Sequence, residues 1–185
     1  MARLYLVRHA QADAGWGDGL DPGLSDKGRA QAGLMAERLA ATGPLPVLTS
    51  PLLRARQTAA ALESRWNIMA VVDPGVGEVP SPSEDVAERQ QWLRAAMATT
   101  WSELGPRYLS WRTMVTELLM GIPHDTVVVT HFVLINAALG RALGSDDVLV
   151  SAVENASVTV FDNGDHELRL IEQERPGRDG TGPVL

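Results

Sequence analysis

The most informative stretch of this chain is LYLVRHAQ at residues 4–11. Its first four residues are a short apolar run with aromatic and β-branched content, which predicts a β-strand. That strand leads directly into Arg8 and His9, so a cation and a candidate nucleophile lie at its carboxyl end. In open α/β sheets ligands bind at this edge of the sheet. The Arg-His pair alone is weak evidence for a functional site, and other segments of the sequence must support it.

The 185 residues fit a single domain with enough chain to bury a core. We expect residues 1–173 to form this domain and residues 174–185, rich in Gly, Pro and charge, to be a flexible tail. No apolar run approaches the ~18 residues that a membrane helix needs, and no signal-peptide pattern follows Met1. The chain contains no cysteine, which excludes disulfides and thiolate metal ligands. These features predict a cytoplasmic protein.

The formal net charge of −7 argues against nucleic acid or an anionic membrane as a partner. An acidic protein that binds an anionic substrate must gather its positive charge locally. The positions of individual arginines are therefore informative. The sequence does not predict the oligomeric state.

Strand-like and helix-like segments alternate along the chain. This alternation predicts an α/β fold, a three-layer sandwich in which helices flank a central, largely parallel but mixed sheet. We expect Ser25 to cap the first helix and Gly105-Pro106 to break the third. The expected strands are 4–7, 46–50, 69–72, 126–130, 155–161 and 166–171, the last two joined by a turn at 162–165, and the expected helices are 25–42, 52–66, 84–121 and 132–143.

Two more strands end next to basic side chains. Arg54 lies one turn into the helix that follows strand 46–50, and His131 directly follows strand 126–130. If these strands are parallel neighbours of the first, both side chains join Arg8 and His9 at one edge of the sheet. The sequence thus predicts a compact cationic pocket in an acidic protein.

Phosphate is the ligand that fits such a pocket. The arginine fork matches a tetrahedral oxyanion, and helix N-termini add N–H donors. A neutral His9 can attack phosphorus, while the arginines and a charged His131 stabilise the charge that develops on the oxygens. No carboxylates or histidines lie at metal-ligand spacing, so we expect neither metal nor cofactor.

Several segments resemble the histidine phosphatase superfamily, which includes the phosphoglycerate mutases. They occur in the family's order, and the likeness covers roughly residues 3–172. Each segment alone is modest, but together they are specific. The segments are LVRH (6–9), LSDKGRAQA (24–32), SPLLRARQTA (50–59), VVVTH (127–131) and NASVT (155–159).

This resemblance implies a phosphoglycerate mutase-like fold and a role for each matching residue. His9 would be the nucleophile that becomes phosphohistidine, and Arg8, Arg54 and His131 would form the phosphate pocket. The family's proton donor is usually an acidic residue in the loop after the third strand, which Glu78 matches best. The alternatives for that role are Glu84 and Asp85.

Two positions depart from the family's pattern. Glycine is usual after the Arg-His pair and common after the second histidine, where this chain has Ala10 and Phe132. Both residues add bulk beside the phosphate site. The departures therefore bear on which substrates fit rather than on the chemistry.

The function expected from the sequence is metal-independent hydrolysis of small phosphomonoesters. Three alternatives stay open: a phosphoprotein or phosphohistidine phosphatase, a phosphoglycerate-type mutase, and a module that binds phosphoryl groups without turnover. The expected partner is a small phosphorylated substrate, with a phosphoprotein as the alternative.

Other conspicuous residues have simpler interpretations. We expect Arg56, His124 and His166 at the surface, and Gln11 either contacts substrate or stabilises a turn. The aromatic residues of 84–121 are expected in the core, with a place at the substrate entrance as the alternative; they are Trp92, Trp101, Tyr108 and Trp111.

Overall fold

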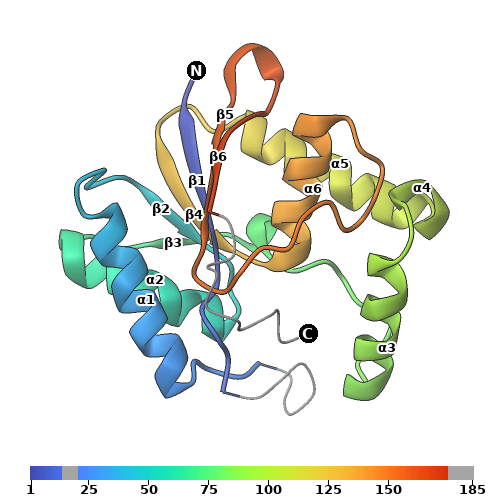
Figure 1. The fold of residues 1–185 in the computed structure, drawn as a ribbon, viewed down its shortest axis with the longest axis horizontal. Coiled ribbons are helices and arrows are strands. Elements are labelled where there is room, and N and C mark those ends of the chain that lie inside the picture. Colours follow the sequence, from blue (N-terminus) through green and yellow to red (C-terminus); the bar gives the residue numbers. More distant parts are fainter. Residues whose placement is uncertain (14–20, 175–185) are drawn as a thin grey trace.

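The computed structural model of the protein describes residues 1–13 and 21–174. A mixed six-stranded sheet lies between two layers of helices (Figure 1), as the sequence predicts. The strands are β1 (Arg3–Arg8), β2 (Val47–Thr49), β3 (Val71–Val72), β4 (Thr126–Thr130), β5 (Val158–Asp162) and β6 (Arg169–Gln173). The helices are α1 (Asp26–Leu39), α2 (Leu53–Trp66), α3 (Val86–Met97), α4 (Trp101–Leu104), α5 (Pro106–Met120) and α6 (Phe132–Leu143), with 3-10 turns η1 (Pro74–Val76) and η2 (Gly164–His166).

The order of the strands is β3-β2-β4-β1-β5-β6. The first four are parallel to one another, and β5 runs antiparallel to both β1 and β6. All five residues of β4 are buried, which explains its unbroken β-branched and apolar sequence. Val7 lies opposite Val129, and Arg8 lies opposite Thr130. The carboxyl ends of β1 and β4 therefore lie side by side.

Helices α1 and α2 cover one face of the sheet (Figure 1). Ser25 caps α1 as predicted, because its side-chain oxygen accepts a hydrogen bond from the Gly28 N–H at 3.0 Å. The apolar residues of α1 recur at helical spacing and pack with those of α2 against the sheet. Met35 of α1 and Leu62 of α2 are completely buried in this layer.

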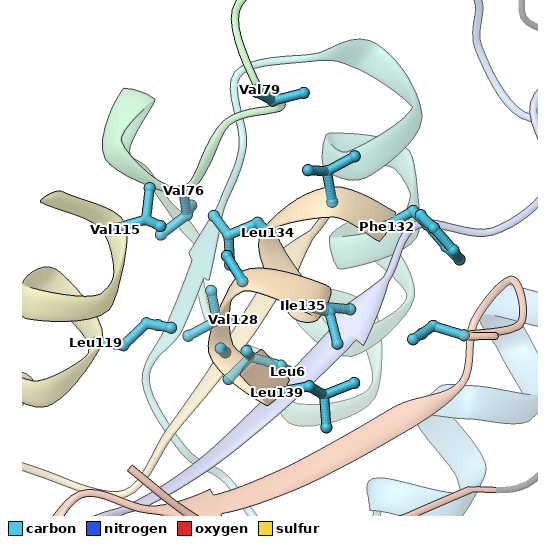
Figure 2. Packing of buried hydrophobic residues seen from close by; sticks show 14 of the residues in the cluster. Leu6, Val76, Val79, Val115, Leu119, Val128, Phe132, Leu134, Ile135 and Leu139 are labelled. Carbon is cyan, nitrogen blue, oxygen red and sulfur yellow. The ribbon is translucent and has the colours of Figure 1, made fainter. Parts of the chain in front are cut away.

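The opposite face carries the larger core, with α6 at its centre (Figure 2). Leu134 and Ile135 of α6 are completely buried. Most residues of this helix are buried, which explains why it is apolar on nearly all sides. The core interpretation of the four aromatic residues is confirmed. Trp101 and Tyr108 are core members, and Trp92 and Trp111 pack against them.

Some boundaries differ from those predicted. Residues 84–121 form three helices rather than two, because Thr100 and Glu103 make a capping box that starts α4 after a break. The predicted break at Gly105-Pro106 is confirmed. The last two strands begin three residues later than expected. The connection between them contains η2, where Asp165 and His166 have positive φ, and this delays the start of β6.

One prediction falls almost wholly on residues outside the described ranges. The expected tail at 174–185 lies outside them except for Glu174. The domain boundary at residue 173 stays a prediction. Within residues 1–13 and 21–174, no helix has the length and apolar character needed to cross a bilayer.

Candidate active site

The parallel strands bring the predicted site residues to one edge of the sheet. Backbone hydrogen bonds continue past the strand ends and tie the segments together. His9 N–H donates to the Thr130 carbonyl at 2.8 Å, and Ser50 N–H donates to the Val129 carbonyl at 3.0 Å. The residues that follow β1, β2 and β4 therefore occupy fixed positions beside one another.

Two contacts fix the tautomer and orientation of the His9 ring. The residue is 3% exposed, and Nδ1 lies 2.8 Å from the Ala10 carbonyl oxygen. A carbonyl only accepts, so Nδ1 carries the hydrogen and Nε2 keeps a lone pair. Arg54 Nε donates to that lone pair at 3.2 Å. Burial, with the charges of Arg54 and Arg8, lowers the pKa of His9 well below its usual value, so the imidazole is neutral at pH 7.

Arg8 is buried, with part of its guanidinium unpaired in the described ranges. Nη1 donates to the Val153 carbonyl at 2.6 Å, and the guanidinium lies 5.0 Å from the centre of the Phe132 ring. Within the described ranges, its buried Nε has no hydrogen-bond partner. Burial lowers the pKa of Arg8 to about 10, which still leaves it charged at neutral pH. An anion in the pocket could accept from Nε.

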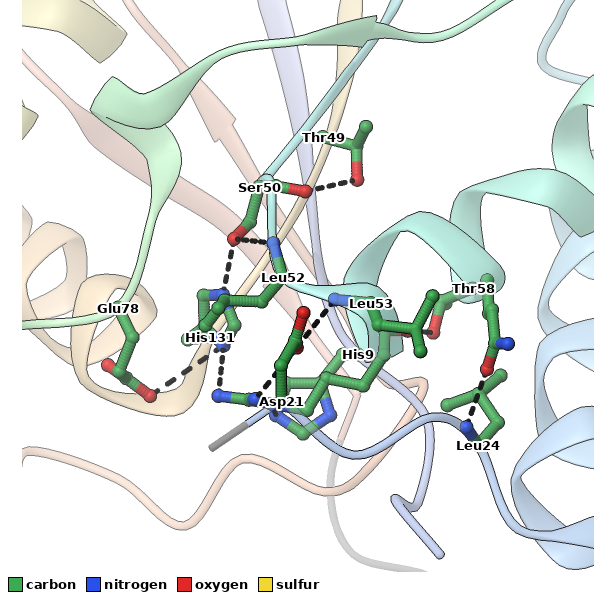
Figure 3. Close-up of polar contacts among 12 residues, drawn as sticks. His9, Asp21, Leu24, Thr49, Ser50, Leu52, Leu53, Thr58, Glu78 and His131 are labelled. Carbon is green, nitrogen blue, oxygen red and sulfur yellow. Dashed lines mark hydrogen bonds and ion pairs between the residues drawn. The ribbon is translucent and has the colours of Figure 1, made fainter. Parts of the chain in front are cut away.

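The ring of His131 is completely buried 5.1 Å from the ring of His9, centre to centre. Its Nδ1 lies 3.4 Å from Arg54 Nη2, and its Nε2 lies 2.7 Å from Ser50 Oγ (Figure 3). Arginine only donates, so Nδ1 accepts and Nε2–H donates to the serine oxygen.

Without a bound anion the imidazole of His131 is uncharged, and the charged form expected during phosphoryl transfer stays a prediction. Burial lowers the pKa of His131 well below its usual value, and the neighbouring His9 and Arg54 lower it further. Three groups that can carry positive charge lie against one another, so the uncharged imidazole is favoured. A phosphoryl dianion in the pocket would reverse this balance by favouring the imidazolium.

Glu78 comes from the loop after β3 and points toward His131 (Figure 3). Its Oε2 lies 3.7 Å from His131 Nδ1, and its Oε1 accepts from the Val79 N–H at 2.9 Å. In the described part of the chain, Oε2 has no hydrogen-bond partner. Burial raises the pKa of Glu78, although the Arg54 charge opposes the rise. This carboxyl therefore keeps its proton to a higher pH than an exposed glutamate.

The alternative acids are not brought into this group. Glu84 and Asp85 are both exposed, and Asp85 accepts from the Glu88 N–H as the cap of α3. Within residues 1–13 and 21–174, no three His, Asp or Glu side chains form a group able to hold a metal ion. The structure thus gathers Arg8, His9, Arg54, Glu78 and His131, while their chemical roles stay predictions.

A family model described as "Histidine phosphatase superfamily (branch 1)" matches residues 4–174. The chain belongs to this family. The resemblance expected from the sequence motifs is confirmed.

Curated glucosyl-3-phosphoglycerate phosphatases match part of the chain. Over 80 residues it is 45% identical to the glucosyl-3-phosphoglycerate phosphatase of Mycolicibacterium vanbaalenii, and 39% identical to that of Mycobacterium tuberculosis. Each alignment covers 41% of this chain and 36% of the relative. The aligned segment thus spans about a third of the curated relatives' length.

Solved structures of histidine phosphatases match nearly the whole chain. The mycobacterial glucosyl-3-phosphoglycerate phosphatase with VO3 is 26% identical, with a TM-score of 0.70 over 92% of this chain and 97% of that one. The phosphoserine phosphatase of Entamoeba histolytica is 18% identical, with a TM-score of 0.76 over 95% and 98% of the two chains. The second likeness concerns the fold alone.

Three polar side chains of this histidine phosphatase site were not singled out as site residues from the sequence. Ser50 holds His131, and Asn155 Nδ2 donates to the His9 carbonyl at 3.0 Å. Asp21 accepts from the Leu53 N–H at the start of α2 at 2.7 Å (Figure 3), and lies 4.0 Å from Arg54. Ser50 and Asn155 lie inside matched motifs, which is the signal that could have identified them.

The residues expected to have simpler roles lie where the sequence places them. Arg56, His124 and His166 are exposed. The Gln11 backbone supports the turn after β1, since its N–H donates to Gln31 Oε1 at 3.0 Å and its carbonyl accepts from Ser25 N–H. A contact between the Gln11 side chain and substrate stays a prediction.

We expect Ser50→Ala to lower kcat about 10-fold, because a buried His131 N–H would lose its acceptor and the imidazole its fixed tautomer. The measurement combines steady-state kinetics with ¹⁵N NMR of the His131 ring. Ser50→Thr keeps the hydroxyl and should keep both the ¹⁵N shifts and most of the turnover. Wild-type kcat in Ser50→Ala would show that this hydrogen bond does not matter for catalysis.

Proposed function

We propose that this histidine phosphatase hydrolyses small phosphomonoesters through a phosphohistidine on His9. The observation that carries the proposal is the hydrogen bond from His9 Nδ1 to the Ala10 carbonyl, 2.8 Å long, which leaves Nε2 as a fixed lone pair beside Arg54. A buried, neutral imidazole aimed into a pocket with two arginines is suited to attack a bound phosphoryl group.

In the first step a phosphoryl oxygen replaces His9 Nε2 as the acceptor of the hydrogen bond from Arg54 Nε. The Nε2 lone pair then forms a bond to phosphorus, and the bond from phosphorus to the ester oxygen breaks. Glu78 gives its proton to that oxygen, so the leaving group departs as an alcohol. Arg8 and Arg54 hold the negative charge on the non-bridging oxygens.

The second step returns the site to its starting state. Glu78, now a carboxylate, takes a proton from a water molecule whose oxygen attacks phosphorus. The nitrogen–phosphorus bond breaks, and inorganic phosphate leaves with His9 neutral again. Because the arginines supply the positive charge in both steps, we expect turnover without added metal.

A panel of phosphomonoesters tests this proposal, assayed with and without a chelator. It should include glucosyl-3-phosphoglycerate, which the names of the mycobacterial relatives give as their substrate. We expect turnover that the chelator does not change. Dependence on a bisphosphate activator would favour a mutase, and turnover confined to phosphoproteins would favour a protein phosphatase. Tight phosphate binding without turnover would favour a binding module.

Glu78→Gln tests the proton donor. The variant should lose about 10²- to 10⁴-fold in kcat/KM for an alkyl phosphate, whose alkoxide needs a proton to leave. The loss should be much smaller for p-nitrophenyl phosphate, since p-nitrophenolate leaves without protonation. The same two substrates assayed with Glu84→Gln test the alternative acid. A dependence on the leaving group that changes in Glu84→Gln but not in Glu78→Gln would move the role to Glu84.

The pH profile of wild-type kcat/KM should follow from the two pKa shifts. Attack needs neutral His9, so activity falls as the pH drops through its lowered pKa, well on the acid side of an ordinary histidine. Protonation of the leaving group needs the acid form of Glu78, so activity falls as the pH rises through its raised pKa. Glu78→Gln should remove the alkaline fall, which steady-state kinetics across pH would measure.

A further inference from the structure

Thr130 is the last residue of β4 and bonds to two segments of the active site. Its backbone carbonyl accepts from the His9 N–H at 2.8 Å, and its hydroxyl donates to the Val76 carbonyl at 2.6 Å. Thr130 and Val76 are both completely buried. One residue therefore joins the segment that carries the expected nucleophile to the loop that carries the expected proton donor, Glu78.

The geometry of the Thr130 hydroxyl is well defined. Branching at Cβ restricts rotation about χ1, so the hydroxyl keeps one direction in the packed sheet. A buried hydroxyl and a buried carbonyl each need a partner. Among the described residues, no other donor reaches the Val76 carbonyl. Loss of the hydroxyl would therefore leave this carbonyl buried without a hydrogen bond.

The hydrogen bond from Thr130 is also the last one, among the described residues, that ties the Glu78 loop to the sheet. The hydrogen bonds of residues 77–84 stay within the segment between β3 and the first turn of α3. The side chains of Val76 and Val79 are buried in the core, so apolar packing keeps this loop folded. The hydrogen bond is directional, and it fixes the backbone two residues before the Glu78 carboxyl.

We propose that Thr130 is a positioning residue for Glu78, and that its hydroxyl sets the place of the general acid relative to His9. The inference rests on the proposed function. A general acid acts only within hydrogen-bond reach of the oxygen that it protonates, so a displacement of about 1 Å impairs proton transfer. The bond to His9 is made by the backbone of Thr130, so a change of its side chain acts on the acid and spares the nucleophile.

Thr130→Val tests this role, because it removes the hydroxyl and keeps the branching at Cβ. We expect kcat/KM for an alkyl phosphate to fall about 10-fold, since its leaving oxygen needs the proton from a well-placed Glu78. p-Nitrophenyl phosphate should be hydrolysed nearly as in the wild type, because its leaving group departs without protonation. The measured quantity is the ratio of kcat/KM for p-nitrophenyl phosphate to kcat/KM for the alkyl phosphate.

Three comparisons separate positioning of the acid from a general loss of structure. Thr126→Val removes a buried hydroxyl at the other end of β4, where it donates to the His124 carbonyl at 2.7 Å, and should leave the ratio unchanged. Thr130→Ser keeps a hydroxyl and should keep the ratio close to that of the wild type. In a Glu78→Gln background Thr130→Val should not change the ratio further, because the proton donor is already absent.

The outcomes separate this inference from the proposed function. Suppose that Glu78→Gln shows the expected dependence on the leaving group. A wild-type ratio in folded Thr130→Val, an equal loss for both substrates, or a change in the ratio that persists in the Glu78→Gln background would then overturn the inference. Thr130→Ala removes the same hydroxyl and takes the place of Thr130→Val if thermal melting shows that the valine variant does not fold.

A different result would reach the proposed function itself. If Glu78→Gln lowers kcat/KM for the two substrates to the same extent, Glu78 is not the proton donor. That result would contradict the proposed first step, and the role of Thr130 would fall with it.

Discussion

His9→Ala should reduce phosphomonoester turnover by roughly 10⁴-fold or more, because the nucleophilic nitrogen is removed while Arg8 and Arg54 stay in place. The ring of His9 is buried, and its Nε2 lies 3.2 Å from Arg54 Nε. The measurement is kcat for the best substrate of the panel.

His124→Ala is the matched control, since it removes an exposed histidine that precedes β4, at the strand end opposite to His131, and should leave kcat unchanged. Circular dichroism and thermal melting of both variants would confirm that they fold. A folded His9→Ala protein that hydrolyses phosphomonoesters at the wild-type rate would exclude His9 as the nucleophile.

Arg54→Ala should lower kcat/KM about 10²- to 10³-fold, the loss typical when one donor to a developing oxyanion is removed. Arg54 contacts both His9 Nε2 at 3.2 Å and His131 Nδ1 at 3.4 Å, so it organises both imidazoles as well as the phosphoryl oxygens. Arg56→Ala is the control, because Arg56 lies two residues along the same helix and is exposed.

The same variant makes a prediction about pH. The Arg54 charge lowers the pKa of His9, so its removal should raise that pKa. The acid side of the kcat/KM profile, where His9 must be neutral, should then move to higher pH in Arg54→Ala and stay in place in Arg56→Ala. An unshifted profile in Arg54→Ala would mean that Arg54 does not act on the imidazole that limits activity at low pH.

The sequence predicts the fold well where the local signals are strong. The β-branched run of β4, the Ser25 cap of α1 and the apolar spacing of α1 all lead to the observed elements. The break before Trp101 was missed, since the Thr100–Glu103 capping box lies within a stretch of helix-forming residues. Likewise, the positive φ at Asp165 and His166 lengthens the last hairpin connection. These residue types permit that conformation but do not require it, so the sequence does not predict it.

The sequence predicts those site residues that directly follow a strand. Arg8, His9 and His131 directly follow strands, and parallel pairing is enough to bring them together. Asp21 carries no such signal, because it reaches the site from a loop rather than from a strand end. The charge of His131 also could not be read from its residue type, since it depends on burial beside His9 and Arg54.

The central claim is that a phosphoryl group is transferred to His9, and trapping this intermediate tests it most directly. Wild-type protein mixed with substrate, quenched rapidly in base and digested for peptide mass spectrometry should carry one phosphoryl group on His9 that is stable in base and lost in acid. His9→Ala should carry none. An acid-stable phosphoryl group on another residue, or turnover with no phosphoryl group on the protein under conditions where hydrolysis of the intermediate limits the rate, would contradict the claim.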